Sequence, residues 1–377
     1  MSSLSAHEAV KASRRLVIKI GSALLVEKET GQLREAWLKA LAKDVAALKA
    51  KGTQVILVSS GAIAMGLEPL GFDRKPAKLE EAQAAASVGQ IRLAQAYQSL
   101  FGAEGMVIGQ ILLTIHDLEN RPSYLNARNT VEALVERGVV PVINENDTVA
   151  TAEIRFGDND RLAARVAQMA GADTLILLSD IDGLYECDPR EKADAHFFDR
   201  VDAITPEIEA MAGPPSAITP GTGGMITKLK AAKIALAGGC SMIIMNGHAP
   251  SPVMRLEAGE RSTLFPAATD PMTVRKQWIS SLMAPRGFLH VDAGAVKALR
   301  QGASLLPAGV TEVDGNFDRG DLVAFVGPDG HIVGQGLSSY SVEHATLMRG
   351  RKMQDAYEVL GHVGRSALVH RDDLVLL

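Results

Sequence analysis

The sequence predicts an α/β fold: a doubly wound, mainly parallel sheet sandwiched by helices, followed by a small β-rich domain. Up to about residue 265, short apolar runs alternate with helical patterns, which is typical of such sheets. The runs are continuously apolar rather than alternating, which indicates strands buried on both faces. Beyond that point, Gly and Asp punctuate shorter runs. With 377 residues, the chain is too long for one ordinary domain.

Composition favours a globular protein and gives no sign of a nucleic-acid, metal-binding or membrane protein. The chain is 47% apolar and 22% charged, which is typical of globular proteins, and its formal charge of −5 does not favour a nucleic-acid partner. Its two cysteines form no metal-binding pattern. The N-terminus lacks a signal-peptide core, and no apolar run reaches the roughly 18 residues of a membrane helix. We therefore expect a cytoplasmic protein with no membrane partner.

The elements of the first domain follow in order. The expected strands are apolar runs at 16–25, 54–60, 107–114, 139–144, 174–180 and 241–247. Helical periodicity predicts helices near 35–51, 78–100, 121–137, 160–170 and 225–237. Ligands of such sheets bind beyond the C-terminal ends of the strands, so polar residues at these ends are the candidate site.

The domain limits follow from the change in pattern. We expect a first domain at 1–265, a linker at 266–285 and a β-rich domain at 286–377. In the last domain the strand-like runs are FLHV, SLLP, LVAFVG and HIVGQGL.

Lys19 is the first candidate, because it lies inside the apolar run VIKIGS. A buried lysine is costly unless its charge meets an anion, and the following Gly21 and Ser22 suit a phosphate. The alternative is a lysine on an edge strand that reaches solvent.

Two further glycine-rich segments precede helical patterns. Ser59, Ser60 and Gly61 end the second strand, where they suit either an anion site or a simple helix cap. GTGGMITK at 221–228 resembles two phosphate-binding motifs and completes neither, yet it leads into a helix that contains Lys228. The alternative is a flexible loop before a helix.

The stretch VINENDTVATAEIRFGDND at 142–160 turns abruptly from apolar to polar. Its acids and amides suit metal binding, orientation of lysines or recognition of a substrate, but Asp158 and Asp160 equally suit a helix cap. Ser179 and Asp180 end another strand, where a nucleotide or a simple turn would fit. His116 and Asp117 are adjacent, and adjacent residues seldom face each other, so we interpret them as structural.

These segments in this order resemble the amino-acid kinase family. VIKIGS, VSSGAIAMG, INENDTVA, RFGDND and GTGGMITK are similar to the branch that phosphorylates glutamate, and ASLLPAGVTEVDGNFDRGD at 303–321 resembles a PUA domain. The likeness covers nearly all of the chain after about residue 14. It implies the amino-acid kinase fold and ATP-dependent phosphorylation of the γ-carboxylate of L-glutamate, with Mg²⁺, as the first step of proline biosynthesis.

The resemblance also implies roles for individual residues. Lys19, Lys228 and Asp160 match catalytic positions, with Asp160 holding the two lysines. Ser60, Asp147 and Asn159 match positions that bind glutamate. The positions that match the ATP site are Lys19, Ser179, Asp180, Thr222, Gly223, Gly224, Met225, Ile226, Thr227 and Lys228. No protein ligand for a metal is assigned, and Glu145, Glu153 and Asp158 have no assigned role.

Elementary chemistry agrees with this resemblance. Glutamate has a side-chain pKa of about 4.3, so its carboxylate is already a nucleophile at neutral pH and needs no general base. Two anions must instead be brought together, which requires positive charge and positioning. Asp147 would then pair with the substrate's ammonium group.

Other functions stay open at this stage. A related kinase would phosphorylate acetylglutamate or aspartate, although an acid that faces an ammonium argues against an acetylated substrate. An RNA-binding or regulatory protein is another class, but the segment from Arg286 onward has nine Lys or Arg against eleven Asp or Glu. That charge lacks the basic footprint of an RNA surface. The resemblance further implies a homo-oligomer, dimer or tetramer, and inhibition by proline.

Overall fold

The computed structural model describes residues 4–27, 30–72, 78–150, 159–192, 194–212, 224–281, 285–361 and 365–377. The chain divides into two compact units, Met1–Pro271 and Met272–Leu377. Each unit has its own hydrophobic core. Among the helices of the described ranges, none combines the length and the apolar character that a membrane span requires.

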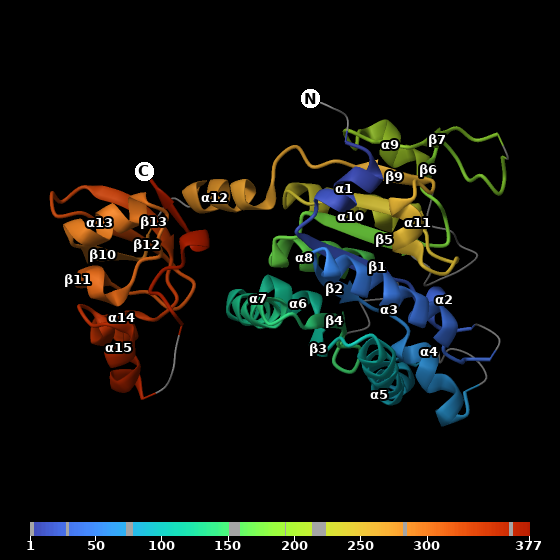
Figure 1. The fold of residues 1–377 in the computed structure, drawn as a ribbon, viewed down its shortest axis with the longest axis horizontal. Coiled ribbons are helices and arrows are strands. Elements are labelled where there is room, and N and C mark those ends of the chain that lie inside the picture. Colours follow the sequence, from blue (N-terminus) through green and yellow to red (C-terminus); the bar gives the residue numbers. More distant parts are fainter. Residues whose placement is uncertain are drawn as a thin grey trace. The chain divides into compact units, whose positions relative to one another are not determined.

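A seven-stranded sheet forms the centre of the first unit (Figure 1). Its strand order is β3-β4-β2-β1-β5-β8-β9, and only the edge strand β9 is antiparallel to its neighbour. The strands are β1 (Arg15–Ile20), β2 (Gln54–Val58), β3 (Ile108–Leu113), β4 (Val140–Glu145), β5 (Thr174–Ser179), β8 (Ser241–Asn246) and β9 (Ser262–Phe265). The prediction of a mainly parallel sheet is confirmed.

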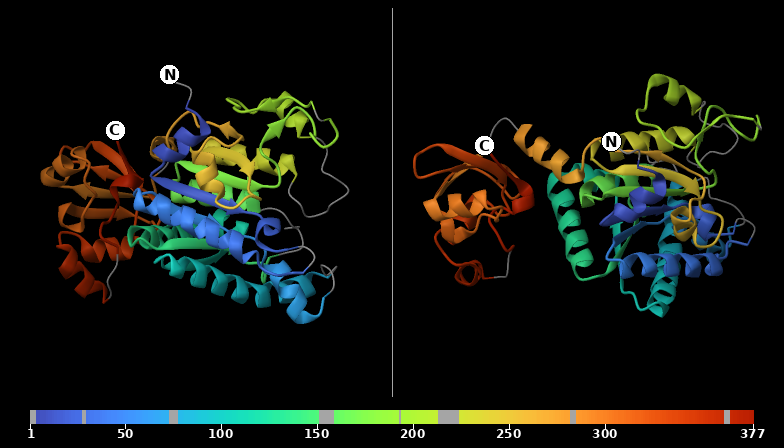
Figure 2. Two further views of the ribbon diagram at one scale, coloured as in Figure 1. Left: turned by 45° about the vertical axis from the view of Figure 1, so that its right-hand side comes forward. Right: turned by 45° about the horizontal axis from the view of Figure 1, so that its top comes forward.

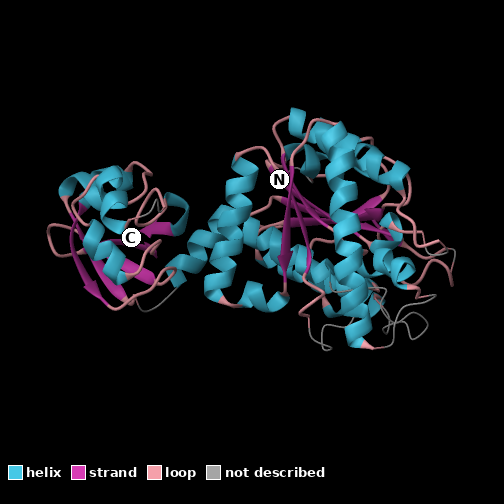
Figure 3. Ribbon diagram, turned by 90° about the horizontal axis from the view of Figure 1, so that it is seen from below, coloured by secondary structure: helices cyan, strands magenta, loops and turns pink. Residues whose placement is uncertain are grey.

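Helices cover both faces of this sheet, as the views in Figures 2 and 3 show. One face packs against α1 (Ala6–Ala12), α2 (Ser22–Leu25), α3 (Glu35–Ala50), α4 (Ala62–Leu67), α5 (Leu79–Ala103) and α11 (Pro252–Glu257). The other packs against α6 (Ile115–Glu119), α7 (Arg121–Glu136), α8 (Asn159–Ala170) and α10 (Met225–Ala237). Alternate residues of β1 enter the two cores: Leu16 and Ile18 enter the first, and Val17 enters the second. We call these the α5 face and the α8 face.

The unit departs from the expected elements in several places. The first strand ends at Ile20 rather than at residue 25, because Ser22–Leu25 forms the short helix α2 after Gly21. A small hairpin of β6 (Leu184–Tyr185) and β7 (Phe197–Phe198), the helix α9 (Pro206–Met211) and the 3-10 turn η1 (Glu68–Leu70) were not expected. These elements are too short to give a periodic pattern.

The second unit contains a five-stranded sheet in the order β11-β10-β12-β13-β14. Its elements are α12 (Pro271–Ser281), β10 (Gly287–Val291), α13 (Ala293–Arg300), η2 (Pro307–Gly309), β11 (Val310–Gly315), β12 (Leu322–Val326), β13 (Ile332–Leu337), α14 (Val342–Met348), α15 (Met353–Leu360), η3 (Arg371–Asp373) and β14 (Leu374–Leu376). The run SLLP is not a strand; it forms one isolated bridge, through Leu305 to Val369.

Most of the segment expected as a linker is the helix α12, and it packs within the second unit. Ile279 is buried against Leu322 and Leu337, and its carbonyl accepts a hydrogen bond from the Gln335 side chain at 2.8 Å. One helical turn earlier, Arg275 donates to Asp373 through Nε at 2.9 Å. The helix is therefore held to the rest of the second unit at two points, the sheet and the turn η3.

Candidate active site

Lys19 lies on a central strand, since β1 pairs with β2 on one side and β5 on the other. The alternative of an edge-strand lysine is therefore wrong. Its side chain has the same parity along β1 as Val17 and so faces the α8 side of the sheet. The residue is only 9% exposed. A charge in such a place needs a compensating partner.

Asp160 is that partner, and it joins two lysines. It lies in the first turn of α8 and is 1% exposed. Lys19 Nζ lies 2.6 Å from Oδ1, and Lys228 Nζ, from the first turns of α10, lies 3.0 Å from Oδ2. Residues 19, 160 and 228, far apart in sequence, thus form one buried ion triad.

The triad has two positive charges and one negative charge. Burial alone would raise the pKa of Asp160, but the charges of Lys19 and Lys228 outweigh it and lower that pKa to about 2. The carboxylate is therefore ionised at neutral pH, and the triad keeps one excess positive charge. Two ammonium groups that meet at one carboxylate are well suited to bind a phosphate group brought beside them.

Gly21 lies directly beside the ammonium group of Lys19. A Cβ added there would come no closer than 3.8 Å to Lys19 Nζ and 3.9 Å to the Leu178 carbonyl oxygen. The packing of the described chain therefore does not require a glycine at this position. A glycine backbone allows a ligand to approach closely.

The helix α10 begins at the described end of the expected phosphate loop. Gly224 is its N-cap, and Met225 and Ile226 occupy its first turn. The Thr227 hydroxyl donates to the Gly224 carbonyl at 2.8 Å and lies 3.3 Å from Asp160 Oδ2. Thr222 and Gly223, which were also expected to bind ATP, lie outside the described residues, as do Glu153 and Asp158.

Ser60 and Asn159 form a second cluster. Asn159 Nδ2 donates to Ser60 Oγ at 2.6 Å and to the Ser59 carbonyl at 2.9 Å, and it lies 3.3 Å from Asn144 Oδ1. The alternative for this segment was a simple helix cap, but the N-cap of α4 is Gly61, with φ of 100° and no side-chain cap. The Ser60 hydroxyl is therefore available to the cluster.

The remaining expected site residues lie along the same edge of the sheet. Ser179 ends β5, one position beyond the level of Ile20, and its hydroxyl donates to Asp180 Oδ1 at 3.0 Å. Asp147 is half-buried in the turn after β4, where the Ala150 and Val149 amides donate to the Asn146 carbonyl. No described contact joins Asp147 or Asp180 directly to the triad.

Asp117 has the structural role that its adjacency to His116 suggested. Its carboxylate accepts hydrogen bonds from the Thr114 amide at 2.8 Å and the Thr114 hydroxyl at 2.7 Å, which closes a capping box at the start of α6.

Sequence reasoning missed the polar contacts that α5 makes with this edge. Gln90 accepts a hydrogen bond from Asn144 Nδ2 at 2.8 Å, and Tyr97 OH lies 3.0 Å from Ser59 Oγ. Both residues stand in an Ala-rich helix that gave no local sign of a site. Burial raises the pKa of Tyr97 far above its ordinary value, so the phenol stays neutral.

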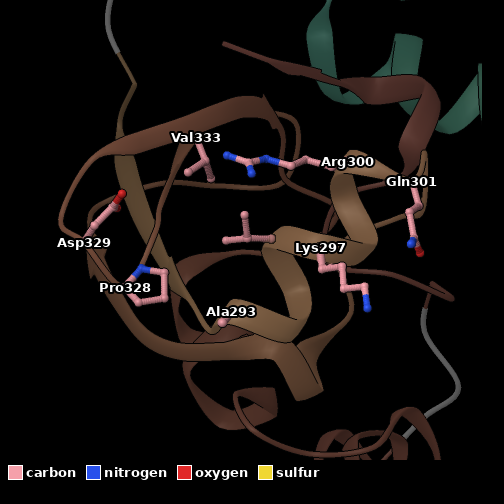
Figure 4. Close-up of a pocket in the computed structure, with 8 residues that line it drawn as sticks. Ala293, Lys297, Arg300, Gln301, Pro328, Asp329 and Val333 are labelled. Atoms are coloured by element: carbon pink, nitrogen blue, oxygen red, sulfur yellow. The ribbon is translucent and has the colours of Figure 1, made fainter.

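The second unit has a separate hollow of about 470 Å³ (Figure 4). It is lined by α13 and by the turn between β12 and β13. Arg300 extends from α13 toward Val333, and Asp329 stands on the opposite wall. None of the residues that the sequence indicated as catalytic lines this hollow.

Comparison with known proteins identifies the family of each unit. Residues 14–246 match the amino acid kinase family and residues 287–360 match the PUA domain. A glutamate 5-kinase of Ruegeria sp. (strain TM1040) is 55% identical over 98% of this chain and 100% of its own. A glutamate 5-kinase of Paramagnetospirillum magneticum is 55% identical over 97% of this chain and 98% of its own. A glutamate 5-kinase of Rhizobium rhizogenes is 54% identical over 99% of this chain and 95% of its own. The buried Lys19–Asp160–Lys228 triad is thus part of a kinase, and the chain belongs to the glutamate 5-kinases of the amino acid kinase family.

Proposed function

We propose that this chain transfers the γ-phosphoryl group of MgATP to the γ-carboxylate of L-glutamate, producing γ-glutamyl phosphate for proline biosynthesis. The observation that carries the proposal is the convergence of Lys19 and Lys228 on buried Asp160, next to the Ser60–Asn159 cluster. The names of the 55%-identical relatives support glutamate as the acceptor.

The two lysines neutralise the charge of the phosphoryl group during transfer. Phosphoryl transfer needs positioning and electrostatic stabilisation more than covalent chemistry. Because Asp160 is ionised and fixes both ammonium groups, they need not reorganise when charge develops between donor and acceptor. Asp160 acts as a positioning group rather than as a base, since the glutamate carboxylate is already deprotonated.

The nucleotide lies on the side of the edge formed by β5 and α10. The N-terminus of α10 offers backbone amides at Met225 and Ile226, and the helix dipole favours phosphate there. Ser179 and Asp180 flank the nucleotide at the end of β5. Mg²⁺ would arrive with the nucleotide as MgATP and would offset part of the phosphate charge.

The acceptor lies on the side formed by β2 and β4. Ser60 and Asn159 hydrogen-bond to glutamate, and the Asp147 carboxylate pairs with its ammonium group. Proline has the same α-ammonium and α-carboxylate groups on a cyclised skeleton. We therefore propose that it inhibits by competing with glutamate for this half of the site.

Glutamate-dependent release of ADP from MgATP tests the proposal. The acceptor panel contains L-glutamate, L-aspartate and N-acetyl-L-glutamate at equal concentrations. We expect turnover with L-glutamate at least tenfold above that with either analogue. Equal or greater turnover with N-acetyl-L-glutamate would overturn the assignment of Asp147 to an ammonium group and the substrate with it.

A further inference from the structure

The helix α5 has a polar stripe that points at the acceptor half of the site. Gln83, Gln90 and Tyr97 are spaced seven residues apart along Leu79–Ala103. Seven residues advance an α-helix by about 10.5 Å and return to nearly the same side, so the three side chains share one face. Other polar residues of this helix, such as Gln95 and Gln98, are exposed, whereas Gln83 and Gln90 are partly buried and Tyr97 is buried.

Each member of the stripe contacts the segment that contains or adjoins the acceptor residues. Gln83 Nε2 donates to the Ala150 carbonyl at 3.0 Å, and Gln90 Oε1 accepts from Asn144 Nδ2 at 2.8 Å. These two contacts hold both ends of residues 144–150, the segment that contains Asp147. Tyr97 OH lies 3.0 Å from Ser59 Oγ, next to Ser60.

Gln90 lies at one end of a chain of hydrogen bonds that runs through Asn144. The Glu145 amide donates to Asn144 Oδ1 at 2.9 Å, so that oxygen must face the backbone and Nδ2 must face Gln90. Asn144 Oδ1 and the Ser59 carbonyl are both acceptors, and they orient the NH₂ group of Asn159 toward themselves. The Asn159 carbonyl oxygen then points away from these partners. Gln90 thus acts on Asn159 through Asn144.

The helix is itself held closely to the Ser60 side of the site. A Cβ on Gly89 would lie 1.8 Å from the Ala62 carbonyl, and a Cβ on Gly66 would lie 1.8 Å from the Ala85 carbonyl. The backbones of α4 and α5 therefore cross in direct contact. Since α4 starts immediately after Ser60, the position of α5 is tied to Ser60 as well as to the Asp147 segment.

We propose that Gln90 and Gln83 are positioning residues that set the affinity for the acceptor amino acid, with α5 as the common support of both parts of the acceptor half. The proposal rests on the phosphorylation of glutamate proposed above. The lysine triad lies on the α8 face of the sheet, whereas the stripe lies on the α5 face. Loss of the stripe should therefore change glutamate binding and leave ATP binding nearly unchanged.

Steady-state kinetics of Gln90→Ala and Gln83→Ala in the full chain test this inference. We expect Gln90→Ala to raise the KM for glutamate by about 5–20-fold, the effect of one lost hydrogen bond to a buried amide, with the KM for ATP within about twofold of wild type. Gln98→Ala is the matched control, because Gln98 is an exposed glutamine of the same helix outside the stripe. It should change neither constant.

A double-mutant cycle separates positioning from general stabilisation. If Gln90 acts through Asn144, adding Gln90→Ala to Asn144→Ala should change the glutamate KM by less than about twofold. Tyr97→Phe removes a single oxygen and provides a milder variant if a glutamine variant fails to fold; it should raise the glutamate KM and leave the KM for ATP unchanged. The proposal would be overturned if the KM for glutamate and the KM for ATP rose equally, or if the effects of Gln90→Ala and Asn144→Ala on the glutamate KM were additive. It would also be overturned if neither Gln90→Ala nor Tyr97→Phe raised the glutamate KM. A wild-type enzyme without glutamate-dependent ADP release would instead refute the proposed function.

Discussion

Replacing Asp160 by asparagine removes the carboxylate between two buried lysines. The Nζ atoms of Lys19 and Lys228 lie 2.6 Å and 3.0 Å from its two oxygens. At an effective dielectric constant of about 20, each attraction is worth about 5.5–6.5 kcal/mol before dehydration of the charges is subtracted. Removing one member of a buried pair has a net cost of about 3–5 kcal/mol, so we expect Asp160→Asn to lower the melting temperature of the first unit by roughly 6–20 °C.

The effect of this variant depends on pH in a defined direction. The pKa of Asp160 is lowered from 3.8 to about 2 in the folded chain, so its stabilisation is fully present above about pH 4 and is lost as the pH falls toward 2. The free-energy difference between wild type and Asp160→Asn should therefore shrink on acidification below pH 4. The lost part is about 2–3 kcal/mol.

Anion binding and turnover should respond to Asp160→Asn in opposite directions. Without the carboxylate, the two lysines have a charge of +2, so inorganic tripolyphosphate should raise the melting temperature by more than it does in wild type. Turnover should fall by about 10²–10³, because the lysines lose their fixed positions. Differential scanning fluorimetry with and without tripolyphosphate, together with ADP release, measures both effects.

A matched control lies in the second unit. Asp373 is a buried acid paired with Arg275, and Asp373→Asn should destabilise that unit without changing turnover or the response of the first unit to tripolyphosphate. The reasoning on Asp160 fails if Asp160→Asn melts within 2 °C of wild type at pH 7 or keeps more than about half of its turnover.

Three further outcomes follow from the same site. Lys228→Ala should lower kcat by about 10²–10³ in the ADP-release assay, the effect of losing one transition-state donor, and near-normal kcat would exclude Lys228 from the mechanism. Asp147→Ala should raise the KM for glutamate with a smaller change in kcat, and an unchanged KM would contradict its pairing with the ammonium group. Proline should raise the apparent KM for glutamate without lowering kcat at saturating glutamate, and inhibition that persists at saturation would exclude competition.

The buried strands were the most predictable part of the fold. Continuous apolar runs placed the six parallel strands of the sheet within a few residues, because the central strands are buried on both faces and the edge strand β3 is partly buried. The exception was the first run, 16–25, which continues as apolar residues through α2. Leu24 and Leu25 of that helix enter the core, so hydrophobicity alone could not indicate where the strand ends.

The candidate site was predictable only in part, for a physical reason. Lys19 was detectable because a charged side chain is unusual in an apolar strand. Lys228 was detectable because it follows a glycine-rich turn at the start of a helix. Gln90 and Tyr97 gave no such signal, since a glutamine or a tyrosine is common in a helix. Their role depends on which β-strand α5 crosses, and the one signal for it is the spacing of seven residues from Gln83 to Tyr97.

The two halves of the site lie on opposite faces of one sheet, and consecutive residues join them. Lys19 faces α8, whereas Asn144 and Ser59 contact side chains of α5. At the start of α8, successive side chains point about 100° apart. Asn159 can therefore reach over the sheet edge to Ser60 while Asp160 holds both lysines. Asn159 and Asp160 are consecutive residues of one helical turn, so we expect a shift of this turn to move the Ser60 contact and the lysine contacts together.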